Sequence, residues 1–588
     1  MYKKSVSDIK ELKDYAIYLS SDHNAYLNLG GDLNFCKPYN GLYSVKNKMF
    51  VENIALKVER DNENYKITNF NTLNSSITTD ECLEIADTSV MYYEYKIHNV
   101  YIAMKIKFLS DSNILAIEYF ASNENNKKVN LKIIPLVTYK DVLACKKTED
   151  LKFNKKQLSN GVRIDLSVLD NNSVFLKSDI GIFKEIDGYL KNVTHELNTE
   201  KGTKEIIIED LYVPGEFDVK LKPKSESVFR VYISNAEFEV NECILDEAKS
   251  IRKIPKVSEE FIELKKLTKA IIAFDNDNLT SSIPSYIDVN NLSNYLDPKN
   301  SIFAINELIK IVNAIEGQYI VFKNLKKAID KLKKIIGMIN IIGRNKETCE
   351  IYEFNLLKLW TIECINKVYE VERGVSIEFE GYIKEVISNL HKQVEESSKF
   401  LNNLEYICLS FNTFKIYENM YDSLVYSEVI SLLKKNVTNK FYIPSVHILK
   451  SNMYEGKLYA SADMVYSLSL SYPVLDGEIG AKVLDTIFKE LYTPYGLRKY
   501  SKISDKNDFL IYPKYMAHFV KANLKQNGVT YASQKIAYNL VKELLQDIDK
   551  TVLNSCRCVY HEKGIVVDKN SLDLLTTAEL IRLYYMFI

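Results

Sequence analysis

The chain has 588 residues, long enough to bury at least one large core. Hydrophobic residues make up 46% and charged residues 26%, a composition that excludes a wholly disordered chain. Lys and Arg total 77 against 78 Asp and Glu, so the formal net charge is -1. A general nucleic-acid binder needs a basic surplus to neutralise phosphates, so no nucleic-acid partner is expected.

The first two-fifths of the chain has the pattern of short strands. Apolar and polar residues alternate from Val100 to Phe108, as in a half-buried antiparallel strand. A turn sequence at 111–113 precedes a second apolar run at 114–120, and further short strands are predicted at 129–138 and 229–233. Regular short strands separated by turn residues predict an antiparallel β-sandwich over residues 1–250.

Near residue 250 the apolar period changes from two to about 3.6. Helical spacing is found from Ile305 to Ile315, where Gly317 is expected to cap the helix, and again at 325–336 and 484–491. No strand-rich interruption is expected after residue 258. Because no fixed-period repeat supports a solenoid, residues 251–588 are predicted to form a closed helical toroid. The fold class expected is therefore α+β, a sandwich followed by a toroid.

Several signals bear on location and cofactors. The N-terminus has no apolar signal-peptide core, and the densest apolar run, 335–342, is far shorter than the roughly 20 residues of a membrane span. Nine cysteines suggest reduced thiols, so a cytoplasmic protein without membrane contact is expected. Neither Cys556 and Cys558 nor the seven histidines have metal-ligand spacing, and no phosphate-binding loop occurs, so we expect no metal and no cofactor.

Five segments, in order along the chain, carry a family resemblance: Tyr39-Asn40-Gly41-Leu42, Leu131–Asp141, Glu353–Leu357, Leu491–Arg498 and Thr577–Arg582. Together they resemble the glucosidase half of glycogen-debranching enzymes, the amylo-α-1,6-glucosidase family. The resemblance spans nearly the whole chain. It implies a β-sandwich packed on a six-hairpin (α/α)6 toroid, with a site for α-glucan (glycogen or maltooligosaccharide) at one mouth of the ring.

The family's catalytic carboxylates are only partly retained. Hydrolysis with inversion needs a carboxylic acid and a second carboxylate roughly 6.5–9.5 Å apart. The family's Gly-Asp-Trp-Gly-Arg-Asp segment falls on Ile287–Leu292, which retains Asp288 but has Leu292 in place of the acid. Asp288 is therefore either a substitute acid or a residue that caps the following helix or faces solvent. Glu562 is the best positional match to the second carboxylate, or else a surface group paired with a neighbour.

Substrate contacts are predicted from the same resemblance. Glu353 and Asn355 match the family's Glu-Ile-Asn-Ala-Leu segment. Asp463 stands in the position of its Arg-Pro-Asn-Gln run, and Tyr512 in that of its Tyr-His-Gln-Gly-Thr-Val-Trp-Pro-Trp segment. Most of the polar and tryptophan positions of these segments are replaced, and the chain has a single tryptophan, Trp360, so few aromatic platforms for sugar rings are expected.

Three hypotheses follow. The leading one is a protein of α-glucan metabolism with a degenerate catalytic site, a pseudoenzyme that binds glucan or a partner enzyme. The second is an active inverting α-1,6-glucosidase that uses Asp288 and Glu562, or other carboxylates of the chain, to hydrolyse branch stubs. The third is a structural or assembly protein that no longer binds carbohydrate. The mouth of the toroid should distinguish them. Two facing carboxylates there would support the active glucosidase, aromatic residues without such carboxylates would support the binding protein, and a filled mouth would support the structural protein.

Overall fold

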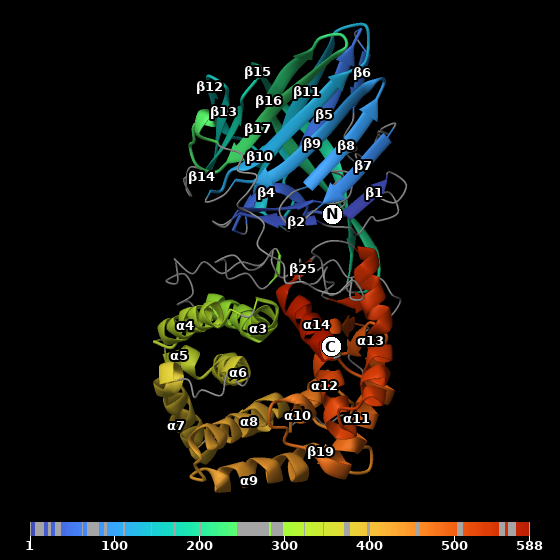
Figure 1. Cartoon of the computed structure of the whole chain (residues 1–588). Coiled ribbons are helices and arrows are strands. Elements are labelled where there is room, and N and C mark those ends of the chain that lie inside the picture. Colours follow the sequence, from blue (N-terminus) through green and yellow to red (C-terminus); the bar gives the residue numbers. More distant parts are fainter. Residues whose placement is uncertain are drawn as a thin grey trace.

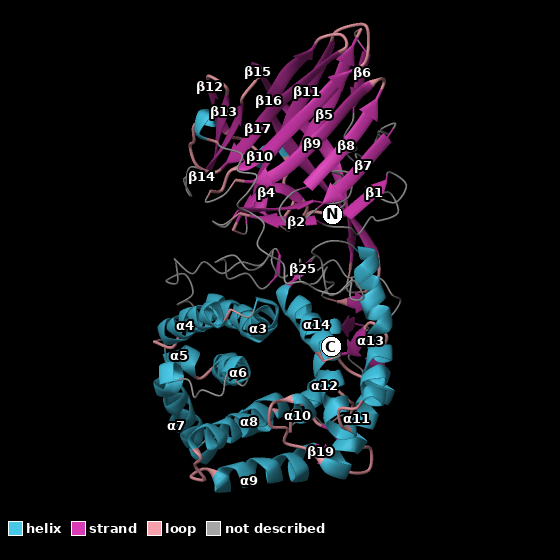
Figure 2. Ribbon diagram, in the orientation of Figure 1, coloured by secondary structure: helices cyan, strands magenta, loops and turns pink. Residues whose placement is uncertain are grey.

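The computed structural model describes all of the chain except residues 1, 6–16, 22–24, 30–36, 47, 62, 67–80, 87–90, 110–111, 143, 168–171, 181, 200, 244–281, 284–297, 323, 345, 370–376, 397–399, 454–457, 502–509, 552–558, 562–571 and 587–588. The N-terminal part is built of strands, and the C-terminal part is a ring of helices below it (Figures 1 and 2). The predicted order of a sandwich followed by a toroid is thus confirmed. The predicted boundary at residue 250 lies outside the described residues.

Two antiparallel sheets form the sandwich. The first has the order β1-β7-β8-β9-β10-β17-β14-β13-β12, with bounds Tyr2–Ser5, Glu81–Ala86, Met91–Ile97, Val100–Phe108, Leu115–Asn123, Ser225–Ser234, Asn172–Ser178, Gly161–Ser167 and Asn154–Leu158. The second has the order β15-β16-β11-β5-β4-β3-β2, with β6 paired to β5; the bounds are Ile182–Asn198, Lys204–Leu221, Val129–Asp141, Lys48–Arg60, Gly41–Val45, Ala25–Leu29, Ile17–Ser20 and Glu63–Lys66.

The alternation in the sequence explains how these sheets pack. In β9 the apolar residues Val100, Ile102, Met104 and Ile106 are buried between the sheets, and the intervening side chains are only partly buried. This is the pattern of a strand that buries one face. The strands predicted at 100–108, 114–120, 129–138 and 229–233 are confirmed as β9, β10, β11 and β17.

A group of ionisable side chains, Glu52, Lys140, His195 and Glu209, is fully buried on the second sheet; we call it the buried ion cluster. Lys140 Nζ lies 2.8 Å from both carboxylate oxygens of Glu209 and 3.0 Å from Glu52 Oε2. His195 Nε2 contacts Glu209 and lies 3.4 Å from Glu52 Oε1. Burial, and then the charge of Glu209, raise the pKa of Glu52 well above its usual range. Burial lowers the pKa of His195. Both shifts favour the uncharged forms of Glu52 and His195, which reduces the net charge buried in the cluster.

The helices of the ring are α3 (Pro298–Phe322), α4 (Leu325–Ile342), α5 (Lys346–Cys349), α6 (Tyr352–Tyr369), α7 (Glu380–Glu396), α8 (Leu404–Tyr421), α9 (Ser427–Asn436), α10 (Tyr466–Ser469), α11 (Gly477–Leu491), α12 (Met516–Asn527), α13 (Tyr531–Thr551) and α14 (Leu574–Tyr585). Of the described helices, the last, α14, packs against the first, α3, and closes the ring. In the described part of the chain, no helix is both long and apolar enough to cross a membrane.

Gly317 does not end a helix, as its sequence position suggested, but lies inside α3. A Cβ atom built on Gly317 would lie 2.6 Å from the Ala578 Cβ and 2.9 Å from the Ala578 Cα. The glycine is therefore needed for the close approach of α3 and α14, and the cap prediction was wrong because sequence alone does not distinguish these two uses of glycine.

The toroid also contains short strands that the sequence pattern did not predict. A four-stranded sheet, in the order β21-β22-β23-β24, is made of Tyr492–Thr493, Gly496–Arg498, Leu510–Tyr512 and Tyr560–His561. Two smaller pairs join β18 (Ser282–Ile283) to β25 (Leu572–Asp573) and β19 (Tyr442–Ile443) to β20 (Ile448–Leu449). Strands of two or three residues are too short for alternation to reveal.

Candidate functional site

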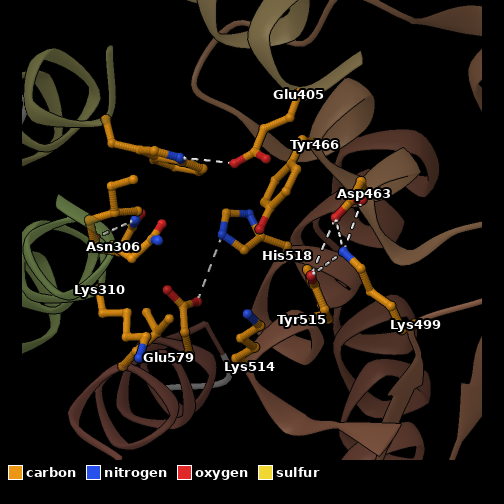
Figure 3. Close-up of a pocket in the computed structure, with 14 residues that line it drawn as sticks. Asn306, Lys310, Glu405, Asp463, Tyr466, Lys499, Lys514, Tyr515, His518 and Glu579 are labelled. Carbon is orange, nitrogen blue, oxygen red and sulfur yellow. Dashed lines mark hydrogen bonds and ion pairs between the residues drawn. The ribbon is translucent and has the colours of Figure 1, made fainter. Parts of the chain in front are cut away.

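A cavity of about 330 Å³ opens on the inner wall of the toroid. Its walls come from α3, α6, α8, α10, α12 and α14, together with the segments that follow β22 and β23. Figure 3 shows Glu405 and Glu579 reaching into it from opposite sides, with His518 between them. Segments far apart in the sequence therefore converge on one small, polar site.

Aromatic rings form one wall of the cavity. Trp360, on α6, packs edge-on to Tyr466 with ring centroids 5.4 Å apart. His518, on α12, packs edge-on to Tyr466 at 5.1 Å. Burial raises the pKa of Tyr466 well above its usual range, so its hydroxyl remains a neutral donor and acceptor. Such rings offer flat apolar faces beside polar edges.

Glu405 lies in the first turn of α8, a helix that begins where Asn403 caps it by accepting a hydrogen bond from the Tyr406 backbone N–H at 3.3 Å. The indole Nε1–H of Trp360 donates to Glu405 Oε1 at 3.1 Å. Burial, and then the negative charge of Asp463, raise the pKa of Glu405 to about 7, although the Trp360 hydrogen bond opposes the shift. Glu405 therefore exchanges its proton near neutral pH.

Asp463 is held by a cation and a phenol. Lys499 Nζ donates to both oxygens of Asp463 at 2.8 and 2.9 Å, and the Tyr515 hydroxyl lies 3.3 Å from Oδ1. Burial alone would lower the pKa of Lys499, but Asp463 outweighs it and the pKa is raised. The pair is thus an ammonium and a carboxylate in fixed positions, both able to bind hydroxyl groups.

Glu579, which lines the cavity, belongs to a buried ion network on α3, α6 and α14. Arg582 donates to Glu579 Oε1 at 2.7 Å, and its Nε lies 3.1 Å from Glu316 Oε2. Lys367 Nζ lies 3.3 Å from the same Glu316 oxygen. Burial would raise the pKa of Glu316, but Arg582 and then Lys367 lower it to about 2. These pairs fix the position of Glu579, which is 1% exposed.

His518 lies close to Glu579 as a neutral ring. Burial, and then the positive charge of Arg582, lower the pKa of His518 well below its usual range. Its Nδ1 lies 2.9 Å from the Ser469 hydroxyl, and its Nε2 lies 4.0 Å from Glu579 Oε2. A neutral imidazole can both donate and accept, so it suits the hydroxyl groups of a polyol.

The sequence-predicted residues fall in different places. Asp463 lines the cavity. Glu353 lies half-buried in the first turn of α6, and Asn355 donates to the Cys349 and Ile351 carbonyls at 3.1 and 3.2 Å, so neither is among the described residues that line the cavity. Tyr512 ends β23 and packs on Tyr515 without lining the cavity itself. The two catalytic candidates, Asp288 and Glu562, lie outside the described residues.

Sequence reasoning missed Glu405 and Lys499 and undervalued Trp360. Lys499 directly follows the Leu491–Arg498 segment, and Glu579 lies inside the Thr577–Arg582 segment, so both were within reach of the family resemblance. A single tryptophan predicts few aromatic platforms for sugar rings, yet this one tryptophan lines the cavity. Glu405 carries no sequence signal of its own, because its raised pKa depends on burial and on a distant aspartate.

In the described part of the chain, one group of side chains has the composition of a metal site, namely Glu52, His195 and Glu209 of the buried ion cluster. The ammonium of Lys140 contacts both carboxylates there. A lysine therefore already supplies the positive charge that these carboxylates need.

Comparisons with known proteins agree with this architecture. Residues 44–228 match the family model of the glycogen debranching enzyme N-terminal region, and residues 266–563 match that of amylo-alpha-1,6-glucosidase. A search of curated proteins found none that matches the chain.

Among solved structures, a bacterial glucoamylase complexed with acarbose is similar over 97% of this chain and 93% of its own, with a TM-score of 0.53 at 11% identity. A putative kojibiose phosphorylase from the human microbiome covers 99% of this chain and 88% of its own, with a TM-score of 0.44 at 9% identity. At these identities the glucoamylase supports the fold alone. The amylo-alpha-1,6-glucosidase match covers just over half of the chain and includes all the residues that line the cavity except Leu575 and Glu579. The chain therefore belongs to the amylo-alpha-1,6-glucosidase family.

Proposed function

We propose that this protein binds the end of an α-glucan in the toroid cavity and serves α-glucan metabolism through that binding. The observation that carries the proposal is the cavity itself, which combines the aromatic faces of Trp360 and Tyr466 with the fixed ion pair of Asp463 and Lys499. Its volume of about 330 Å³ is at the lower end of the roughly 300–1,000 Å³ of small-molecule sites. Such a cavity suits a terminal sugar unit better than the middle of a chain.

The proposal includes a degenerate catalytic site. The position of the family's acid is taken by Leu292, which has no proton to donate. Of the described carboxylates that line the cavity, Asp463 is paired with Lys499 and Glu579 with Arg582, whereas Glu405 has a raised pKa and is the basis of the second candidate function below. Loss of general acid–base help typically costs 10²–10⁴-fold in rate. The purified protein should therefore release no more glucose from branched limit dextrin than its D288N/E562Q double mutant.

Binding can be tested by isothermal titration with maltotriose and maltoheptaose. Asn306 is exposed at the cavity, so N306W should block the opening without burying new surface. Phe303, on the same helix, is 47% exposed and does not line the cavity, which makes F303W the matched control. We expect binding by the wild type and F303W and its loss in N306W. No heat with either sugar, or equal binding by all three proteins, would refute the proposal.

A second candidate function, inverting α-1,6-glucosidase, is favoured by Glu405. A carboxyl with a pKa of about 7 still holds its proton near neutral pH, as a general acid must. It would pass this proton to the glycosidic oxygen as the bond to C1 breaks. Water would add to C1 and lose its proton to a second carboxylate, for which Glu562 is the sequence candidate. Glucose release that E405Q abolishes would establish this function in place of the first.

Two further predictions concern the setting of this binding. A partner enzyme of α-glucan metabolism is a candidate partner of this protein, because a glucan held by that enzyme could place its end in the cavity. A cytoplasmic location, suggested by the odd number of cysteines spread over the chain, is consistent with the free thiols of Cys145, Cys243, Cys349, Cys364 and Cys408. Fractionation of cells together with pull-down on glycogen would test both.

A further inference from the structure

One hairpin of the sandwich extends to the toroid. Strands β15 and β16 meet at a tip whose described residues are 199 and 201–203, and the teal end of this hairpin reaches down toward the ring of helices (Figure 1). The Thr199 backbone N–H donates to the Thr203 carbonyl at 2.8 Å, and the Gly202 N–H donates to the Thr199 carbonyl at 2.9 Å. Gly202 has a φ of +69°, a left-handed conformation that favours glycine. The tip is therefore a defined turn.

This tip packs on the imidazole of His561. A Cβ atom built on Gly202 would lie 2.9 Å from His561 Cε1 and 3.0 Å from each of the two ring nitrogens. His561 is only 2% exposed, so its ring has little room to move away. The contact thus requires glycine at residue 202 for space as well as for backbone conformation.

His561 belongs to the edge strand of the sheet beside the cavity. In β24, His561 pairs with Leu510 of β23, and Tyr512 of β23 pairs in turn with Leu497 of β22. Directly after β22 comes Lys499, and shortly after β23 come Lys514 and Tyr515, which all line the cavity. A displacement of β24 would therefore pass through backbone hydrogen bonds to the lysines of the cavity wall.

The other end of the hairpin arm is anchored. His195, seven residues before Gly202, is fully buried and contacts Glu52 and Glu209 in the buried ion cluster. From His195 to Asn198 the two strands pair without a register shift. Because the hairpin is fixed at His195 and its two strands are paired from there to Asn198, the position of Gly202 at its tip is also fixed.

We propose that Gly202 and His561 are positioning residues: the tip of the β15–β16 hairpin holds the edge of the toroid sheet and thereby sets Lys499 and Lys514 in the cavity. The sandwich would then contribute to ligand recognition, although no described residue of the sandwich lines the cavity. This inference rests on the proposed function for the nature of the ligand, but not for the geometry.

The test replaces Gly202 with asparagine, which tolerates the left-handed backbone but adds the Cβ atom. Gly528 provides a matched control, because it has a φ of +74° and no atom would lie within 4 Å of its added Cβ. We expect G202N to weaken maltoheptaose binding about tenfold. H561A, which removes the support, should act in the same direction. G528N should bind maltoheptaose as the wild type does. The double mutant G202N/H561A should lose less affinity than the two single mutants do together, because without the His561 ring the added Cβ atom of residue 202 no longer clashes.

A second readout needs no ligand. Lys499 and Lys514 lower the pKa of Glu405, whose carboxyl accepts the hydrogen bond from Trp360. If the lysines retreat, the pH midpoint of Trp360 fluorescence should rise by about half a pH unit or more in G202N and H561A. Unchanged midpoint and affinity in folded H561A would overturn the inference, whether or not G202N folds. A wild type that binds no sugar would refute the proposed function and still leave the midpoint as a test of positioning.

Discussion

The hydrogen bond between Trp360 and Glu405 makes the ionisation of the cavity directly observable. Trp360 is the only tryptophan of the chain, and its indole N–H donates to the Glu405 carboxyl at 3.1 Å. We predict that the fluorescence of the folded protein titrates with a midpoint near the Glu405 pKa of about 7, and that E405Q abolishes this transition. His518 also packs against Trp360, but its lowered pKa places its own titration at lower pH.

The same pKa fixes the sign of a stability effect. Glu405 has a pKa of about 7 in the folded protein against 4.5 in the unfolded chain. Between these values the folded state holds a proton that the unfolded chain has released, so the free energy of unfolding falls as the pH rises. At about 1.4 kcal/mol for each pH unit, the loss is at most about 3 kcal/mol and is complete above pH 7.

The replacement E405Q keeps the shape of the protonated carboxyl but cannot ionise. Relative to the wild type, E405Q should therefore gain up to about 3 kcal/mol of stability between pH 4 and pH 8. Urea unfolding followed by Trp360 fluorescence at both pH values measures this difference. If the two proteins show the same pH dependence and no fluorescence transition near pH 7, Glu405 is ionised throughout and the reasoning about the cavity is wrong.

Two other predictions concern the packing that supports the site. K140M removes the cation of the buried ion cluster and should lower the free energy of unfolding in urea by about 3–5 kcal/mol. E52Q should be tolerated at neutral pH, because the pKa of Glu52 is raised. Equal stability of K140M and the wild type would show that the cluster is not held by charge. G317A places a methyl group against α14 and should lower the free energy of unfolding by about 1–3 kcal/mol. G337A, with no atom within 4 Å of the added Cβ, should raise it by about 0.5–1 kcal/mol. If the melting temperatures of both variants change in the same direction, the close helix contact is contradicted.

The fold was largely predictable because its apolar residues keep a regular spacing over long segments of the sequence. The alternation in β9 and the 3.6-residue spacing in α4 and α11 each extend over several turns or pleats, and tertiary packing preserved them. The short strands β21–β24 escaped prediction because two or three residues carry no period. Gly317 was misread because the residue that explains it, Ala578, is distant in sequence.

The site was less predictable than the fold. Asp463 was found by its register against a family motif, and the structure places it in the cavity. Glu405 was not found, because its chemistry arises from burial and from a neighbour 58 positions along the chain, Asp463. Trp360 was visible in the sequence, but its value depends on the helix packing that turns it toward the cavity. Site chemistry here is a property of the tertiary structure.

The central claim, that the cavity binds a glucan end, is tested most directly by following Trp360 fluorescence during titration with maltoheptaose and with a cyclic maltooligosaccharide. The linear sugar has ends and the cyclic sugar has none, while both offer the same linkages. A saturable change with the linear sugar alone is the result predicted from a small cavity that contains Trp360. An equal response to the cyclic sugar, or no response to either, would contradict the claim.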